Sequence, residues 1–238
     1  ERSVGHDTPL GRLLDVAYNI EYGAESTVQS TLNMLYLLGY VGPGQFRTFG
    51  KSNEKFHVRG GNDQVPAALA AQLASQITMG TPLTAIRLNG DGTFTLTFAN
   101  GSGTTTKVAD HVVLALPFST LRLVDYSRAG FNQVKRWAIE ELGMGTNTKL
   151  HLQFGSRFWR NQNCTGETYS DNGYQNTWEV SRAQAGKSGI LVNYTGGTAG
   201  VNAGNGTKEQ AAATFLRLVE PVLPGATAQW NNRVTRDY

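Results

Sequence analysis

FHVRGGNDQVPAALAAQL, residues 56–73, opens the stretch of sequence that decides the fold. The pair Gly60-Gly61 predicts a tight turn, because glycine reaches backbone conformations that other residues avoid. Asn62 or Asp63 can then cap a helix. Apolar residues recur every four positions after the cap, which predicts a helix whose apolar stripe faces a core; they are Val65, Leu69, Leu73 and Ile77.

A three-stranded meander is predicted to follow this helix. Residues 81–88, TPLTAIRL, favour a strand, and NGDG at 89–92 is typical of a hairpin turn. Apolar residues alternate with polar ones over residues 94–98, and residues 104–107 can form the third strand. VVLAL at 112–116, closed by Pro117, is an unbroken apolar run of the kind found in strands buried on both faces.

Four segments in this order resemble the flavin-dependent amine oxidases, which include monoamine, polyamine and L-amino-acid oxidases. The matching segments are RGGNDQVPAALAAQL (59–73), TPLTAI (81–86), ADHVVLALPFSTL (109–121) and GTNTKLHLQFGSRFW (145–159). Each segment is weak evidence alone, because Gly-Gly turns and Leu-Pro strand ends occur in many folds. Their common order and spacing make the resemblance specific.

The resemblance implies an α+β fold built from two kinds of segment. Residues 1–50 would form the helical part of a substrate domain, and residues 51–120 would be an insertion from the flavin domain. This insertion is a partial FAD/NAD(P)-binding-like segment of a helix, a β-meander and a buried strand. Residues 121–238 would supply the sheet and remaining helices of the substrate domain.

The cofactor implied by the resemblance is FAD. The family holds the pyrophosphate of FAD with a G-x-G-x-x-G turn between a strand and a helix, and the sequence contains no such motif. We therefore expect an internal part of a longer protein, with an incomplete FAD site. The family position that meets the adenine through its backbone corresponds to Leu83, and Ala115, Leu116 and Pro117 would lie beside the dinucleotide. Without the resemblance, Leu83 is an ordinary core residue of a strand.

Lys149 is the candidate catalytic residue. Leu150, Leu152 and Phe154 alternate with polar residues, so the strand has one apolar face and Lys149 points away from it. From the alternation alone, Lys149 is a solvated residue on an exposed strand. The resemblance instead implies a lysine that holds a water molecule at the reactive nitrogen of the flavin.

Trp178 is the candidate substrate-binding residue. It lies in YQNTWEV, residues 174–180, a predicted strand. The resemblance places an aromatic residue of the substrate cavity here, where a ring can form one wall around the substrate. A core tryptophan between sheet and helix is the equally open alternative.

Further helices are predicted at both sides of the central stretch. In residues 1–40, Asp7 and Ser26 are the expected N-caps of two helices. Residues 132–142 predict a helix that buries one apolar face; it consists of Val134, Trp137, Ala138 and Leu142.

Composition and motifs exclude several classes of function. The net charge of +3 is spread along the chain without a basic run, so no nucleic-acid partner is expected. No hydrophobic run approaches the length of a membrane span, so no membrane partner is expected either. The four histidines share no ligand spacing, which predicts no metal site. Nucleophile-elbow and phosphate-loop motifs are absent from the sequence.

The expected activity is the oxidation of a small amine or L-amino acid to an imine, with oxygen reduced to hydrogen peroxide. Two alternatives stay open: a flavin-free, inert module, and a flavoprotein similar to desaturases or protoporphyrinogen oxidase. Because the insertion would normally pack on strands outside this sequence, we also expect self-association or association with missing segments. The sequence leaves the cellular compartment open, since its single cysteine, Cys164, says nothing firm about redox environment.

Overall fold

The structure is a computed structural model that describes residues 5–39, 42, 44, 46–50 and 56–238. The chain divides into two compact units, one made of Glu1–Ser52 with Gly145–Tyr238 and the other of Asn53–Met144. We call them the first and second unit. The boundaries predicted from sequence follow residues 50 and 120; the first of these adjoins residues 51–55, which lie outside the described part of the chain.

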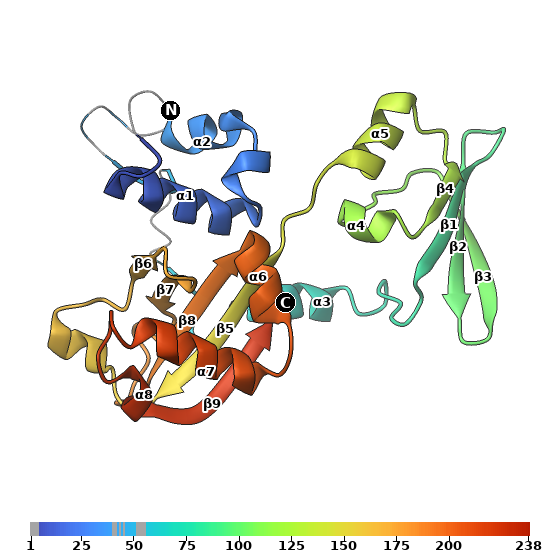
Figure 1. The fold of residues 1–238 in the computed structure, drawn as a ribbon. Helices are drawn as coiled ribbons and strands as arrows, with labels where there is room; N and C mark the ends of the chain where they lie inside the picture. The colour runs from blue at the N-terminus through green and yellow to red at the C-terminus, as the bar shows by residue number, and fades with distance from the viewer. Residues whose placement is uncertain (1–4, 40–41, 43, 45, 51–55) are drawn as a thin grey trace. The chain divides into compact units, whose positions relative to one another are not determined.

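The first unit is built on an antiparallel sheet in the order β6-β7-β8-β5-β9. Its strands are β5 (Asn147–Phe154), β6 (Thr168–Ser170), β7 (Gln175–Glu179), β8 (Gly189–Gly196) and β9 (Trp230–Asp237). The helices are α1 (Pro9–Tyr22), α2 (Thr31–Leu38), α6 (Gly197–Gly204), α7 (Lys208–Val219) and α8 (Ala226–Gln229), with 3-10 turns η1 (Ser26–Val28) and η2 (Phe158–Gln162). Helix α7 lies across the sheet in Figure 1 and contacts β5 and β9.

The core of the first unit lies between α7 and one face of this sheet. Every second residue of β5 is buried there, because successive side chains of a strand point to opposite faces. The cluster contains Leu150, Leu152, Phe154, Phe158, Trp159, Tyr174, Leu191, Ala212, Phe215, Leu216, Val219, Leu223, Ala226 and Val234. The predicted apolar face of β5 is therefore confirmed.

Helix α1 ends at Gly23, which has a φ of 64° and adopts the left-handed conformation. The carbonyl oxygen of Gly23 accepts a hydrogen bond from the Thr146 amide at 2.8 Å, so the helix end is joined to the start of β5. The N-caps differ from those expected: Thr8, and not Asp7, caps α1, while Ser30, and not Ser26, caps α2. Aspartate and serine suit many turn positions, and the local backbone decided which hydroxyl faces the free amides.

The second unit contains the predicted meander. Strands β1 (Leu83–Leu88), β2 (Phe94–Asn100) and β3 (Gly103–Ala109) are antiparallel neighbours, and β4 (Asp125–Arg128) joins β1 in parallel. The helices are α3 (Gln64–Gln72), α4 (Phe118–Leu121) and α5 (Gln133–Glu141). A small core packs Ile86, Leu121, Val124, Ala129 and Ile139.

The predicted buried strand at 112–116 is wrong. These residues belong to no strand, and Val113 is 91% exposed. Val112, Leu114 and Leu116 pack on the small core, so the segment is covered on one side only. A continuous apolar run is buried on both faces only where other elements pack on both sides of it. Among the described residues, only the small core packs on this segment.

Two predicted helix faces are also wrong. The stripe of α3 faces no core, because Val65, Leu69, Leu73 and Ile77 are between 42% and 57% exposed. In α5 the fully buried residue is Ile139, whereas Val134, Trp137 and Leu142 are exposed. Periodicity identifies an apolar face, but packing partners decide whether it is covered.

Candidate functional site

The sheet of the first unit has one face packed on α7 and an opposite face that carries polar and aromatic side chains. Paired residues of antiparallel strands share a face. Lys149 of β5 pairs with Tyr194 of β8 and with Asp237 of β9. His151 pairs with Val192, which in turn pairs with Trp178 of β7. The face opposite α7 therefore gathers Lys149, His151, Trp178, Tyr194 and Asp237, and we call it the lysine face.

Lys149 is exposed and lies against two aromatic rings. Its Nζ is 5.2 Å from the centroid of Tyr194 and 5.9 Å from that of Trp178. The two rings meet edge to face, with centroids 5.4 Å apart and an interplanar angle of 83°. A cation over such rings is attracted by their negative faces, by roughly 0.5–1 kcal/mol at an exposed position. The rings therefore restrict where the long lysine side chain points.

The structure brings together Lys149 and Trp178, which sequence analysis proposed separately. Trp178 is half-buried, with its ring on the lysine face. Tyr194 is not among the site residues predicted from sequence. The alternation in residues 189–196 could have placed its ring on this face, but only the strand register puts it beside Lys149.

Tyr194 provides a neutral hydroxyl on the lysine face. Burial raises the pKa of its phenol, and the negative charge of Glu21 raises that pKa further. The phenol is therefore protonated throughout the neutral range, so the ring next to Lys149 carries no charge.

His151 contributes a poorly solvated imidazole to the same face. Its side chain is 25% exposed, and its Nδ1 lies 3.9 Å from the Asp237 carboxylate. Nδ1 is buried and has no hydrogen-bond partner. Burial lowers the pKa of His151; Asp237 opposes this shift and Lys149 adds to it. The imidazole is therefore neutral at pH 7.

The four residues expected near the dinucleotide all belong to the second unit. Leu83 begins β1 and, with Leu116, packs on the small core of that unit. Ala115 and Pro117 are exposed, and Pro117 immediately precedes α4. Leu83 and Leu116 thus share one cluster, while Lys149 and Trp178 belong to the first unit.

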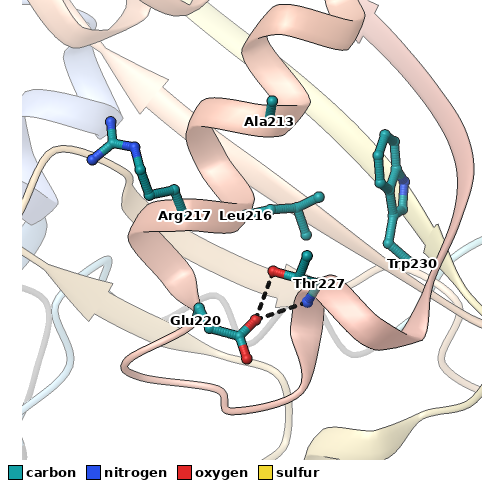
Figure 2. Close-up of a pocket in the computed structure, with 6 residues that line it drawn as sticks. All are labelled: Ala213, Leu216, Arg217, Glu220, Thr227 and Trp230. Atoms are coloured by element: carbon teal, nitrogen blue, oxygen red, sulfur yellow. Dashed lines mark hydrogen bonds between the residues drawn. The ribbon is translucent and has the colours of Figure 1, made fainter.

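A pocket of about 470 Å³ lies on the other side of the first unit (Figure 2). Leu216 of α7 and Trp230 at the start of β9 face it, with Arg217 at one side. Its carboxylate, Glu220, accepts hydrogen bonds from the Thr227 amide and hydroxyl, both at 2.8 Å, and from the Gly225 amide at 2.7 Å. These bonds hold the pKa of Glu220 below its usual value and commit its oxygens to the N-terminal turn of α8. This carboxylate is a structural cap.

A second pocket, of about 550 Å³, lies between the sheet and helices α6 and α7 and is lined by both polar and apolar side chains. Leu150, Asn193 and Thr195 line it, and all three alternate with residues of the lysine face. It therefore opens on the opposite side of the sheet from Lys149.

Among the described residues, no group of three or more His, Cys, Asp or Glu side chains could hold a metal ion. Within the same residues, no helix combines the length and apolarity needed to cross a membrane.

The family model for flavin containing amine oxidoreductases matches residues 1–238. The chain belongs to this family. The family's cofactor is a flavin, and amine or amino-acid oxidases are among its members that resemble this chain. The resemblance noted from the four sequence segments is confirmed.

Curated relatives match part of the chain. A putative L-amino-acid oxidase, YobN of Bacillus subtilis, is 30% identical over 146 residues, which cover 59% of this chain and 30% of the relative. The flavin-dependent L-tryptophan oxidase RebO of Lentzea aerocolonigenes is 29% identical over 109 residues, covering 46% of this chain and 22% of that protein. The chain thus matches less than a third of the length of either relative.

Solved structures share the fold. Cyclohexylamine oxidase from Brevibacterium oxydans superposes with a TM-score of 0.77 at 17% identity, covering 99% of this chain and 51% of that one. A double mutant of putrescine oxidase gives a TM-score of 0.72 at 18% identity, covering 97% and 55%. The chain therefore spans about half the length of these enzymes, with the mixed α and β architecture expected from sequence.

Proposed function

We propose that this chain is part of an FAD-dependent oxidase that converts a small amine or L-amino acid to an imine, with oxygen reduced to hydrogen peroxide. The observation that carries the proposal is Lys149 held over Trp178 and Tyr194 on the lysine face. Family membership supplies the cofactor class, and this cluster supports the proposed position of the chemistry.

The residues present suit the reactive end of a flavin. The lysine face combines a cation, two aromatic walls and a neutral imidazole whose Nδ1 has no partner. Such a face suits a planar, electron-poor ring system next to an apolar amine. When bound, FAD accepts the hydride equivalent that leaves the substrate's α-carbon. Lys149 would lie at the flavin's reactive nitrogen, and the protein's own part is to bind, orient and move protons.

Lys149 carries the proton-handling role. Its ammonium can hold a water molecule by hydrogen bonding and present it at a fixed place, because the rings of Trp178 and Tyr194 limit its rotamers. Trp178 also forms a wall for the apolar part of the substrate. The two roles are compatible, because the ring of Trp178 contacts the ammonium of Lys149 and also borders the proposed substrate position.

The second unit is proposed to meet the adenine side of FAD. The backbone of Leu83 would contact the adenine, and Ala115, Leu116 and Pro117 would border the dinucleotide. The clustering of Leu83 and Leu116 on one small core supports this assignment. The unit would then be the inserted flavin-domain segment expected from sequence.

The chain is further proposed to act within a longer protein, because it spans 51% and 55% of the solved relatives described above. Exposed apolar side chains on α3, among them Val65 and Leu69, support packing against further segments or a second copy of the chain. Light scattering that shows a monomer at high concentration, with flavin bound, would exclude self-association as the way these side chains are covered.

The test is a Lys149→Met variant of the flavin-loaded protein, with Lys187→Met as matched control because Lys187 is an exposed lysine in a loop. L-tryptophan, cyclohexylamine and putrescine serve as probe substrates. We expect Lys149→Met to slow anaerobic flavin reduction by the amine, flavin reoxidation by oxygen, or both, by at least tenfold, and Lys187→Met to change neither. Unchanged rates of both half-reactions would remove Lys149 from the mechanism.

A flavin-free, inert module is the second candidate function. It is favoured by one observation, the absence of a G-x-G-x-x-G turn from the sequence. The absorbance spectrum of the purified 238-residue chain tests the inert module, because a flavin spectrum that persists after dialysis overturns it. A colourless chain that also fails to bind added FAD supports the inert module for the isolated chain, and amine-dependent flavin reduction in the longer protein then decides the oxidase proposal.

A further inference from the structure

We propose that His151 and Asp237 act as a carboxylate–imidazole pair in which Asp237 holds the proton on Nδ1 and Nε2 accepts the proton of the substrate's ammonium group. This inference rests on the proposed oxidase function and assigns the proton acceptor that this function requires. An amine must lose its ammonium proton before it can be oxidised, because the protonated nitrogen has no lone pair to release.

The geometry of the lysine face supports the pair. Nδ1 of His151 is buried, has no hydrogen-bond partner and lies 3.9 Å from Oδ2 of Asp237. Asp237 is on β9, the strand next to β5, and its side chain is 80% exposed. A side-chain rotation that moves this carboxylate by about 1 Å brings Oδ2 of Asp237 to hydrogen-bond length from Nδ1 of His151. A buried ring nitrogen without a partner is otherwise costly, so closing the gap satisfies it.

The pair also lies in the right place. His151 follows Lys149 by two residues on the same strand face, which corresponds to about 7 Å along the strand. It shares a row across the sheet with Val192 and Trp178, so the imidazole and the tryptophan ring border the same surface. A substrate that packs on Trp178 therefore has His151 and Lys149 on its polar side.

The charges around His151 favour a neutral acceptor. Lys149 on β5 disfavours protonation of the ring, and Asp237 on β9 favours it. Tyr194 on β8 is a neutral phenol, and Glu21 of α1 acts on Tyr194. Arg233 of β9 lies one row further, where its guanidinium contacts the side-chain oxygen of Gln153 at 3.4 Å. Burial lowers the pKa of His151, which leaves it unprotonated at pH 7 and able to accept a proton.

The proton moves from the substrate to the chain and then to water. One N–H bond of the ammonium breaks and its electron pair stays on the amine nitrogen. The proton forms an N–H bond at Nε2 of His151, and the resulting imidazolium is stabilised by Asp237 across Nδ1. The proton then passes to water, which restores the neutral ring.

The first test measures the pair itself in the 238-residue chain by ¹⁵N and ¹³C NMR of the histidine rings. We expect His151 in the Nδ1–H tautomer. Asp237→Asn should lower its titration midpoint and shift the ring toward the usual Nε2–H tautomer. His6 is an internal control, because it lies within 3.8 Å of Asp15 but is exposed; Asp237→Asn should leave its ring signals unchanged. An Nε2–H tautomer in the unsubstituted chain, unaffected by Asp237→Asn, overturns the pair.

The second test measures the role in the flavin-loaded protein, with cyclohexylamine as probe. We expect His151→Gln to slow anaerobic flavin reduction at least tenfold at pH 7 and to recover above the pKa of the free amine, where solvent has already removed the proton. A purely structural role predicts no such recovery. His6→Gln should match the unsubstituted protein at every pH.

A His151→Gln deficit that persists at high pH, or no deficit at pH 7, overturns the role. A protein that binds no flavin overturns the oxidase proposal and this role together, and the NMR result still decides whether the pair exists.

Discussion

Substituting Glu179 by glutamine should destabilise the first unit and loosen the wall of the candidate site. Glu179 directly follows Trp178 on β7 and points to the opposite face, where its side chain is 1% exposed. Its carboxylate accepts hydrogen bonds from Arg157 Nε at 2.7 Å, Trp159 Nε1 at 3.1 Å, Arg160 Nη2 at 3.0 Å and Ser181 Oγ at 3.0 Å. These bonds tie β7 to η2 and hold Trp178 in register.

The magnitude follows from what the substitution leaves behind. Removing one partner of a buried ion pair typically costs about 3–5 kcal/mol, because the other charge stays desolvated. Arg157 keeps three carbonyl acceptors, on Ser181, Gln184 and Gly186, at 2.6–3.1 Å. We therefore expect Glu179→Gln to lower the free energy of unfolding by about 3 kcal/mol, the lower end of that range.

The assay is urea unfolding of the chain followed by tryptophan fluorescence, because buried Trp159 donates to Glu179 directly. Glu167→Gln is the matched control, since Glu167 is an exposed glutamate just before β6. The control should stay within about 0.5 kcal/mol of the unsubstituted chain. A Glu179→Gln loss below about 1 kcal/mol would refute the reasoning, because the buried charge of Arg157 would then need no partner.

The Glu179 carboxylate also makes the stability of the fold depend on pH. Burial alone would raise the pKa of Glu179, but the hydrogen bonds from Arg157, Trp159, Ser181 and Arg160 together lower it below its ordinary value. A carboxylate with a lowered pKa in the folded state stabilises the fold above its unfolded pKa, about 4.3. This contribution is lost as the pH falls through the folded value. Stability of the chain should therefore decrease from pH 5 toward pH 3 more steeply than that of Glu179→Gln.

Two further predictions test the helices by the same unfolding assay. Thr207 caps α7 through a capping box with Gln210, so Thr207→Ala should lower the free energy of unfolding by about 1 kcal/mol. Thr214→Ala, on the exposed side of that helix, should lower it clearly less. Equal losses of stability would contradict the cap. Leu69 of α3 is 57% exposed, so Leu69→Ser should change stability by less than about 0.5 kcal/mol, against about 2–5 kcal/mol for Leu152→Ala in the core. A large loss for Leu69→Ser would show that the stripe of α3 is packed after all.

The local elements that sequence predicted well are those specified by short-range chemistry. The turn at Asn89–Gly92 and the pair Asn100-Gly101 bound the strands of the meander as expected. The alternation over residues 147–154 predicted both faces of β5, including the exposed position of Lys149. Asn132 caps α5 as the boundary of the predicted helix suggested. In each case neighbours within a few residues decide the conformation.

The wrong burial predictions share one cause, because an apolar side chain is buried only where another element packs on it. Val112–Leu116 and the stripe of α3 are apolar enough for a core, yet the described residues cover neither completely. In α5 the apolar pattern favoured Trp137, but the residue that packs into the small core of the second unit is Ile139. Sequence periodicity carries no information about which layer lies opposite.

By itself, the sequence determined the family, the strands and turns of the meander, and the side of β5 on which Lys149 lies, because these depend on residue type and spacing along the chain. Only the tertiary structure decided that Tyr194, Trp178 and Asp237 lie beside that lysine and His151, since these three residues come from β8, β7 and β9. Strand register sets those neighbours through hydrogen bonds between segments up to 88 residues apart, Lys149 to Asp237, and no local pattern records which residues will stand opposite one another.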